Sequence, residues 1–298
     1  MGLRIAPNLY STLLYAVSND RQRLNTDLQQ VSTGKAVNVP SDNPAATSAY
    51  IENQTTYAAN DQFQHSISTV EGSLQTGDTT LGSVINNINQ ALSLGIQGAN
   101  GTNSTSELQG LAQEVQAIQQ TVLGLANTSY QGNYLFAGTN VTTAPYVVNV
   151  LSPSGVSYTG NTKTNNIQVG AGQFVDTNLP GSNIFNGAGA DVFQSLHDLS
   201  KALQTNTNVQ GAVNELNSAF NAVNAQRTFY GNTLDQLTSI NNNLTQEQLT
   251  LTTQNGSLIA ADTAKAASNL EQDQTTLQAA LQGFGSISQN TLLNYLKL

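Results

Sequence analysis

Apolar residues recur every three or four positions over most of the chain, a spacing that gathers them on one face of a helix. The pattern predicts helices over residues 10–31, 44–98, 104–125, 192–203, 209–251 and 267–296. A kink or break is expected near Asn60 in the second. Gly34 is placed to end the first helix, and Ser104 with Glu107 has the spacing of a capping box that starts the third. Helices therefore dominate both ends of the sequence.

The first and last helices carry an apolar stripe with the four-three alternation of a coiled coil. Taken alone, such stripes are more often the core of a helical bundle. Their position at both chain ends, with many apolar residues at the C-terminus, favours an assembly interface instead. The residues predicted to form this interface are Leu14, Val17, Leu24, Leu28, Val31, Leu270, Leu277, Leu281, Phe284, Ile287, Leu292 and Tyr295.

The other long helices carry apolar stripes of the same kind, which we call seams, and some positions on them are not apolar. Arg227 and Asn241 lie at heptad positions of the longest seam, where polar side chains fix the register of helices at some expense of stability. An Arg227 that extends its stem to solvent is an equally good interpretation. Gly77, on the seam of the second helix, predicts a close approach of a neighbouring backbone.

The helical period disappears between about residues 140 and 190. Short runs of valine, tyrosine, isoleucine and phenylalanine alternate there with turn sequences such as Pro153-Ser154-Gly155 and Pro180-Gly181. This spacing predicts several short antiparallel strands.

The stretch from Tyr130 to Thr139 separates the two patterns, and we call it the gate. Gly132 and Gly138 can take backbone angles that other residues avoid. Between them we expect an extended, buried strand formed by Tyr134, Leu135 and Phe136.

Helices at both ends and strands in the middle predict a mainly α protein with an inserted β domain. The N-terminal helices run out, a small β-rich domain forms the tip, and the C-terminal helices return alongside in a long coiled-coil bundle. The predicted domains are a terminal coiled-coil domain (1–40 plus 258–298), a helical rod domain (41–137 plus 190–257) and a β-rich outer domain (138–189).

Composition narrows the classes of partner. Of the 298 residues, 9% are charged and the net charge is −9. The nine basic residues are scattered, which argues against nucleic acid and against anionic membranes as partners. The chain has no cysteine, no apolar leader at its N-terminus and no apolar run long enough to span a membrane.

Candidate catalytic groups are sparse. His65 and His197 are the only histidines, and neither has ligand-spaced partners for a metal. Four acidic residues invite an acid–base interpretation, but caps and solvated helix faces explain them better: Asp42, Asp61, Glu71 and Asp78. We therefore expect no enzyme activity, no cofactor and no metal.

Several motifs, in order along nearly the whole chain, resemble hook-associated protein 3, the hook–filament junction family related to flagellin. The gate residues 132–139 are similar to the most diagnostic motif of that family. The other similar segments are 31–38 with 40–46, Val223-Asn224-Ala225-Gln226-Arg227 with Gly231 and Leu234, and 277–281 through 292–296.

The resemblance implies a flagellin-like subunit that joins hook to filament in a ring of identical copies, held by its terminal helices in an inner tube. It implies contacts with the first hook-associated protein and with flagellin. It also implies export through the flagellar type III apparatus without a cleaved signal peptide, with a chaperone on the C-terminal helix. The protein would then be an extracellular part of the bacterial flagellum.

Two alternatives stay open at this point. Filament flagellin belongs to the same structural class, although the gate motif favours the junction protein. A secreted adhesin, with the β region binding a ligand on a helical stalk, belongs to another class. An enzyme acting on the cell wall would need a clustered catalytic set that is not found in the sequence.

Overall fold

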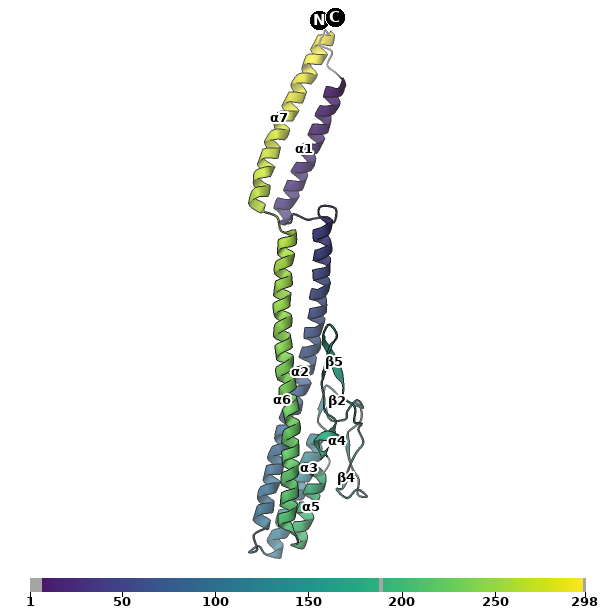
Figure 1. The fold of residues 1–298 in the computed structure, drawn as a ribbon, viewed down its shortest axis with the longest axis vertical. Coiled ribbons are helices and arrows are strands. Elements are labelled where there is room, and N and C mark those ends of the chain that lie inside the picture. Colours follow the sequence, from purple (N-terminus) through teal and green to yellow (C-terminus); the bar gives the residue numbers. More distant parts are fainter. Residues whose placement is uncertain (1–6, 188–189, 297–298) are drawn as a thin grey trace. The chain divides into compact units, whose positions relative to one another are not determined.

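A computed structural model describes residues 7–187 and 190–296 (Figure 1). Most of the chain is helical, as the apolar spacing predicts, and the second helix runs through Asn60 without a break. The helices are α1 (Pro7–Thr33), α2 (Pro44–Gly98), α3 (Thr105–Ala126), the short α4 (Gly181–Ile184), α5 (Val192–Thr205), α6 (Val209–Ile259) and α7 (Thr263–Leu296).

Helix ends follow the local sequence. The Ser104 hydroxyl accepts a hydrogen bond from the backbone N–H of Glu107 at 3.3 Å, and the Glu107 carboxylate accepts one from the Ser104 N–H at 2.7 Å, which confirms the capping box. The hydrogen bond that the carboxylate accepts from the Ser104 N–H stabilises its charged form and lowers the pKa of Glu107. Asp191 caps α5 through the N–H of Gln194 at 2.8 Å. Gly34 has a φ of 69° just after α1, so its predicted role as a helix stop is confirmed.

Within the described residues, the strands form four antiparallel pairs, each of two strands, as expected from the turn-separated runs. Strand β5 pairs with β6 around a register shift between Gln168 and Gly170. An isolated pair of short strands is marginally stable in water, so these hairpins depend on packing against the helices. The strands are β1 (Ser129–Tyr130), β2 (Asn133–Tyr134), β3 (Tyr146–Val148), β4 (Val156–Tyr158), β5 (Asn166–Gly170), β6 (Gln173–Asp176), β7 (Asn186–Gly187) and β8 (Ala190–Asp191).

The chain divides into two compact units, residues 1–58 with 247–298 and residues 59–246. We call them the terminal unit and the central unit. The strand region lies within the central unit, and the three-domain division drawn from the sequence stays a prediction.

The central unit has one hydrophobic core shared by helices and strands. Helices α3 and α5 pack against each other, with Val115 and Leu196 fully buried. Phe136, Tyr146 and Val175 from the strand region are buried in the same cluster. The hairpins share this core with the helices and lie along their side (Figure 1). The fold class is confirmed. The predicted position of the strand region is wrong, because the strands pack against the side of the helices and do not form a tip.

Gly77 shows how two long helices of this unit approach. A Cβ at Gly77 would lie 2.6 Å from a ring carbon of Tyr230 in α6. The expectation of a close backbone contact is therefore wrong. Gly77 makes room for an aromatic ring, and a side chain there would push Tyr230 out of the interface.

Candidate functional site

The terminal unit pairs α1 with α7, the two helices that carry the predicted interface. Their large apolar side chains are only partly covered by this pairing. Leu14 is 47% exposed, Leu28 50%, Val31 36% and Leu281 43%. The other predicted residues whose side chains are described are half-buried, namely Val17, Leu24, Leu270, Leu277 and Phe284.

Three predicted interface residues, Ile287, Leu292 and Tyr295, belong to α7. Their side chains lie outside the described part of the structure. The described stripe is amphipathic, with one face turned to the partner helix and much apolar surface left in water. That surface is what an assembly interface requires, and its use for assembly stays a prediction.

Backbone bonds join the two links of the terminal unit, one between α1 and α2 and the other between α6 and α7. The N–H of Ala36 donates to the carbonyl of Ile259 at 2.7 Å, and the N–H of Ala261 donates to the carbonyl of Gly34 at 2.9 Å. These bonds flank an isolated antiparallel bridge between Lys35 and Ala260. These bonds hold the C-terminal end of α1 next to the N-terminal end of α7.

Two carboxyl groups face each other across the α1–α7 pair. Burial raises the pKa of Asp27, and the neighbouring charge of Asp273 raises it further. Both line a polar hollow with Arg23, one helical turn before Asp27. A like-charged pair at a helix–helix contact weakens that contact while both groups are ionised.

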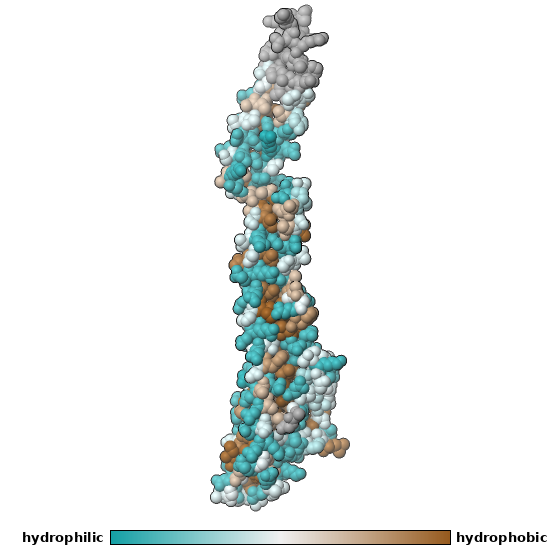
Figure 2. Space-filling view, in the orientation of Figure 1, coloured by the Kyte–Doolittle hydropathy of each residue, from teal (hydrophilic) through white to brown (hydrophobic). Residues whose placement is uncertain are grey.

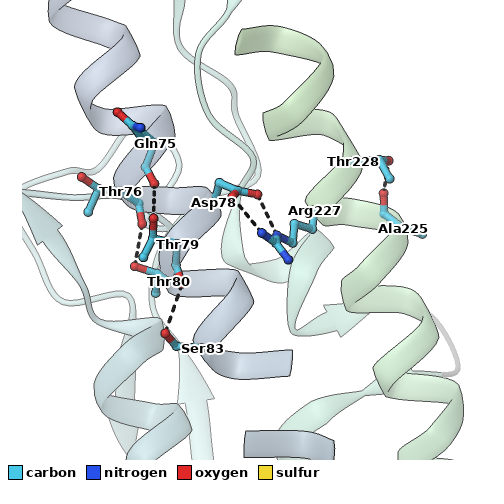
Figure 3. A network of polar contacts seen from close by, with 9 residues as sticks. All are labelled: Gln75, Thr76, Asp78, Thr79, Thr80, Ser83, Ala225, Arg227 and Thr228. Carbon is cyan, nitrogen blue, oxygen red and sulfur yellow. Dashed lines mark hydrogen bonds and ion pairs between the residues drawn. The ribbon is translucent and has the colours of Figure 1, made fainter. Parts of the chain in front are cut away.

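Arg227 lies on α6 and reaches α2, as Figure 3 shows. Its Nε donates to Oδ1 of Asp78 at 2.7 Å and its Nη2 to Oδ2 at 2.9 Å, which is the bidentate geometry of a guanidinium–carboxylate pair. The hydrogen bonds to Asp78 raise the pKa of Arg227. The interpretation of Asp78 as a cap or solvated residue is wrong, since it is a half-buried partner within the helix pair.

A role in register stays a prediction for Arg227, and equally for Asn241, which is half-buried on the same helix. Asp42, Asp61 and His65, also singled out in the sequence, make local contacts. Asp42 accepts hydrogen bonds from the N–H groups of Asn38 and Val39 at 2.9 and 3.0 Å in the loop after α1. His65 lies 3.7 Å from Asp61 on an exposed face of α2.

The gate begins with a tight hairpin, β1–β2. Gln131 and Gly132 at its turn have φ values of 50° and 83°, and positive φ at both central residues is typical of a type I′ turn. Tyr130 of this hairpin packs on α2 at Gly72, where a Cβ would lie 2.9 Å from the ring carbon that carries the hydroxyl. The turn thus fixes the hairpin against α2.

The second half of the gate is not the strand expected from its sequence. Strand β2 ends at Tyr134, and the chain then turns so that Phe136 is fully buried. Its ring meets Phe185 edge-on, with centroids 5.4 Å apart, and its carbonyl accepts from the N–H of Gly181 at 2.7 Å. Packing against the aromatic cluster therefore overrides the strand propensity of Leu135 and Phe136.

Gly138 closes the gate with a φ of 70°. A Cβ there would collide with the side-chain and backbone oxygens of Asn161. The Gly138 carbonyl accepts hydrogen bonds from the amides of Asn165 at 3.3 Å and Asn178 at 3.0 Å. Gly138 is thus the point where the loop before β5 and the segment after β6 attach to the gate.

The described residues contain no cluster of three or more histidine, aspartate or glutamate side chains that could hold a metal ion. None of the helices, over the part of the chain described, is long and apolar enough to cross a membrane.

Two family models match this chain. The bacterial flagellin N-terminal helical region matches residues 8–141, and the bacterial flagellin C-terminal helical region matches residues 213–296. The first match takes in nearly all of α1, the whole of α2 and α3, and the whole gate. The second takes in nearly all of α6 and the whole of α7. The chain belongs to the flagellin family.

Within this family the chain is similar to proteins named flagellar hook-associated protein 3. It is 26% identical to the one from Escherichia coli strain K12 and 25% identical to the one from Salmonella typhimurium. Each similarity covers 93% of this chain and 94% of the relative. These similarities, over nearly the whole of both chains, identify a hook–filament junction protein of the flagellin family, as the gate motif suggested.

The fold is also that of solved relatives. A crystal structure of FlgL from Bacillus cereus superposes with a TM-score of 0.59 at 23% identity, covering 69% of this chain and 99% of that one. The arrangement of helices and the small strand-containing middle region is therefore shared.

Some important residues of this flagellin-family chain escaped the sequence reasoning. Asp78 lies 149 positions from Arg227, and Asn161 and Asn178 lie 23 and 40 positions from Gly138. No local spacing reveals such contacts. The one usable signal is that Arg227 occupies a seam position, which calls for an acidic partner on a facing helix.

Proposed function

We propose that this chain is a structural subunit that joins the hook of the bacterial flagellum to its filament. The observation that carries the proposal is the similarity to hook-associated protein 3 over nearly the full length of both chains. The alternative of filament flagellin has no comparable support, and we expect no catalysis and no cofactor.

In this proposal the terminal helices are the means of assembly. The half-exposed stripe of α1 and α7 is covered by neighbouring copies in a ring that forms part of an inner tube. Such an interface is heterologous, because each copy uses one face towards the preceding copy and another towards the next. The hydrophobic effect then favours incorporation, at about 25 cal/mol for each Å² of apolar surface removed from water.

The same proposal names the partners. The first hook-associated protein lies on one side of the ring and flagellin on the other. Before assembly, a chaperone covers the C-terminal helix, whose apolar stripe would otherwise be exposed during passage through the flagellar type III apparatus. The final location is the extracellular flagellum.

A single substitution tests the role of the stripe. In a strain lacking this protein, we expect the wild-type chain to restore attached filaments and Leu281→Asp to fail, because the new carboxylate would be buried between copies. Gln278→Asp is the matched control, since it places the same charge on an exposed, polar position of α7. Electron microscopy counts cells with attached filaments, and circular dichroism confirms that each purified variant is folded.

Normal attachment with Leu281→Asp would show that the stripe is not the contact surface. Attached filaments in the deletion strain itself would contradict the whole proposal.

A further inference from the structure

Three asparagines of this chain are followed directly by glycine, at residues 100, 186 and 255. An asparagine in this position can lose its side-chain amide without an enzyme. The backbone nitrogen of the glycine attacks Cγ of the asparagine, the bond from Cγ to Nδ2 breaks, and ammonia leaves with the proton of the glycine N–H. Water then opens the resulting succinimide ring, so that aspartate or isoaspartate replaces asparagine. Glycine permits the attack best, because no side chain stands beside its nitrogen.

The fold decides which of the three pairs can react. The asparagine side chain must be free to turn towards the backbone, and the glycine N–H must be free to give up its proton. Water must also reach the ring that forms. Regular secondary structure opposes the reaction, because in an α-helix each N–H donates to the carbonyl four residues earlier and the backbone angles are fixed.

Asn100 and Gly101 meet these conditions. They lie in the turn of the central unit that joins α2 to α3 (Figure 1), and both are exposed. Among the described residues, neither the side chain of Asn100 nor the N–H of Gly101 has a hydrogen-bond partner. A Cβ at Gly101 would have no atom within 4 Å, so the space around the pair is open.

The same turn also activates the peptide group between these two residues. The carbonyl of Asn100 accepts hydrogen bonds from Nδ2 of Asn103 at 2.8 Å and from the N–H of Asn103 at 3.3 Å. Hydrogen bonds polarise the groups that they join, so these two draw electron density away from the nitrogen of Gly101. The N–H of Gly101 therefore gives up its proton more readily.

The pair at Asn186 is held by its neighbours. Oδ1 of Asn186 accepts from the hydroxyl of Tyr146 at 2.7 Å, and Nδ2 donates to the carboxylate of Asp191 at 2.8 Å. Gly187 lies in β7, paired with Ala190 of β8. This side chain cannot turn towards the backbone without breaking both of its hydrogen bonds.

The pair at Asn255 is protected by a helix. Asn255 is 6% exposed, its Oδ1 accepts from Nδ2 of Asn53 at 3.0 Å, and Gly256 continues α6. Asn103, followed by Ser104, is a further comparison within the reactive turn itself. Its side chain donates to the carbonyl described above, and the N–H of Ser104 is held by the capping box.

We propose that Asn100 is a site of spontaneous deamidation in the folded chain, with water as the only co-reactant, while Asn186 and Asn255 stay intact. Each event adds one negative charge to the formal −9 and accumulates with the age of the chain. The surface is mostly hydrophilic (Figure 2), so it accommodates an exposed carboxylate.

The product weakens the turn in two ways. Its carboxylate lies just after the C-terminal end of α2, where the helix dipole disfavours an anion. Isoaspartate also adds a methylene group to the backbone, which displaces the carbonyl that accepts from Asn103.

Peptide mapping of the purified, full-length chain tests the assignment. One sample is incubated folded and another in urea, both at mildly alkaline pH, which speeds the loss of the glycine proton. Digestion after glutamate and lysine places the three pairs on different peptides, and mass spectrometry measures the fraction of each that is converted. We expect conversion at Asn100 alone in the folded sample and at all three asparagines in urea.

Gly101→Ala is the matched variant, because its methyl group fits the open space but obstructs the nitrogen. It should lose most of the conversion at Asn100, and circular dichroism checks that it is folded. A folded wild-type chain in which Asn100 stays as intact as Asn186 and Asn255 would refute the proposal. Equal conversion of Gly101→Ala and wild type would exclude the succinimide route. Both measurements use the isolated chain, so neither outcome bears on the junction role.

Discussion

At the scale of single residues, Gly138 and Arg227 connect segments that are far apart in the sequence. Gly138 holds the segment before β5 and the segment after β6 to the gate through Asn165 and Asn178, and only a residue without a Cβ fits there. Arg227 ties α6 to α2 through Asp78. Each contact is a specific, testable constraint on the central unit.

Replacing Gly138 by alanine should destabilise the protein by more than about 1 kcal/mol. Alanine is strained at a positive φ, and its methyl group would collide with Asn161. Gly124→Ala is the control, because Gly124 lies on an exposed face of α3 with no neighbour near a Cβ, and alanine favours a helix there by about 1 kcal/mol. Denaturant unfolding followed by circular dichroism measures both, and equal stabilities would contradict the steric argument.

Breaking the Arg227–Asp78 pair should have a modest effect. The two side chains are 40% and 30% exposed, so a double-mutant cycle with Arg227→Ala and Asp78→Ala should give a coupling of about 0.5–1 kcal/mol. Arg227→Lys should lose most of it, because lysine cannot form the bidentate pair. The coupling should shrink in high salt. A coupling indistinguishable from zero at low salt would show that the pair does not contribute to the stability of this unit.

At the scale of elements, the helices were predictable and the details of the gate were not. The residues that form a helical apolar stripe recur every three or four positions, and the residues of a cap such as Ser104 with Glu107 are three apart. Both patterns are therefore visible in the sequence. The conformation of the gate depends instead on contacts with residues outside it. The N–H of Leu135 donates to the carbonyl of Thr128, and the carbonyl of Phe136 accepts from the N–H of Gly181, 45 positions away. The strand propensity of these residues therefore gives way to tertiary packing. The flanking position of the hairpins likewise follows from a shared core that no local pattern reveals.

The pairing of α1 with α7 should strengthen as the pH falls. The pKa of Asp27 is raised in the folded state, so folding is favoured when Asp27 is protonated and this contribution is lost as the pH rises through the folded pKa. Between neutral pH and about 4, acidification should therefore protect α1 and α7 from proteolysis by an acid-tolerant protease.

Asp27→Asn should give the same protection at pH 7 and remove most of the pH dependence. Arg23, which lines the same hollow, is left unchanged in both chains. Asp20→Asn on the same helix removes an equal charge away from that hollow and serves as the control. Unchanged cleavage of Asp27→Asn relative to wild type would show that the Asp27–Asp273 contact does not limit the pairing.

At the scale of the whole molecule, the two units bury their apolar residues very differently. The central unit has a continuous core in which Ile67, Leu81, Leu196 and Leu216 are fully buried. In the terminal unit, the described large apolar side chains of α1 and α7 are all at least partly exposed. A unit of this kind reaches its full stability only when another surface covers the stripe.

Hydrogen exchange on the purified chain tests that difference directly. We expect rapid exchange in residues 7–33 and 263–296 and strong protection from about residue 62 to residue 251. The reason is that local opening of α1 and α7 exposes little additional apolar surface, whereas opening of the central core exposes a great deal. The same terminal segments should become protected in isolated flagella, which makes assembly itself the control. Full protection of both ends in the monomer would instead mean that α1 and α7 complete a self-contained pair, and that reading would favour a stalk carrying a binding module.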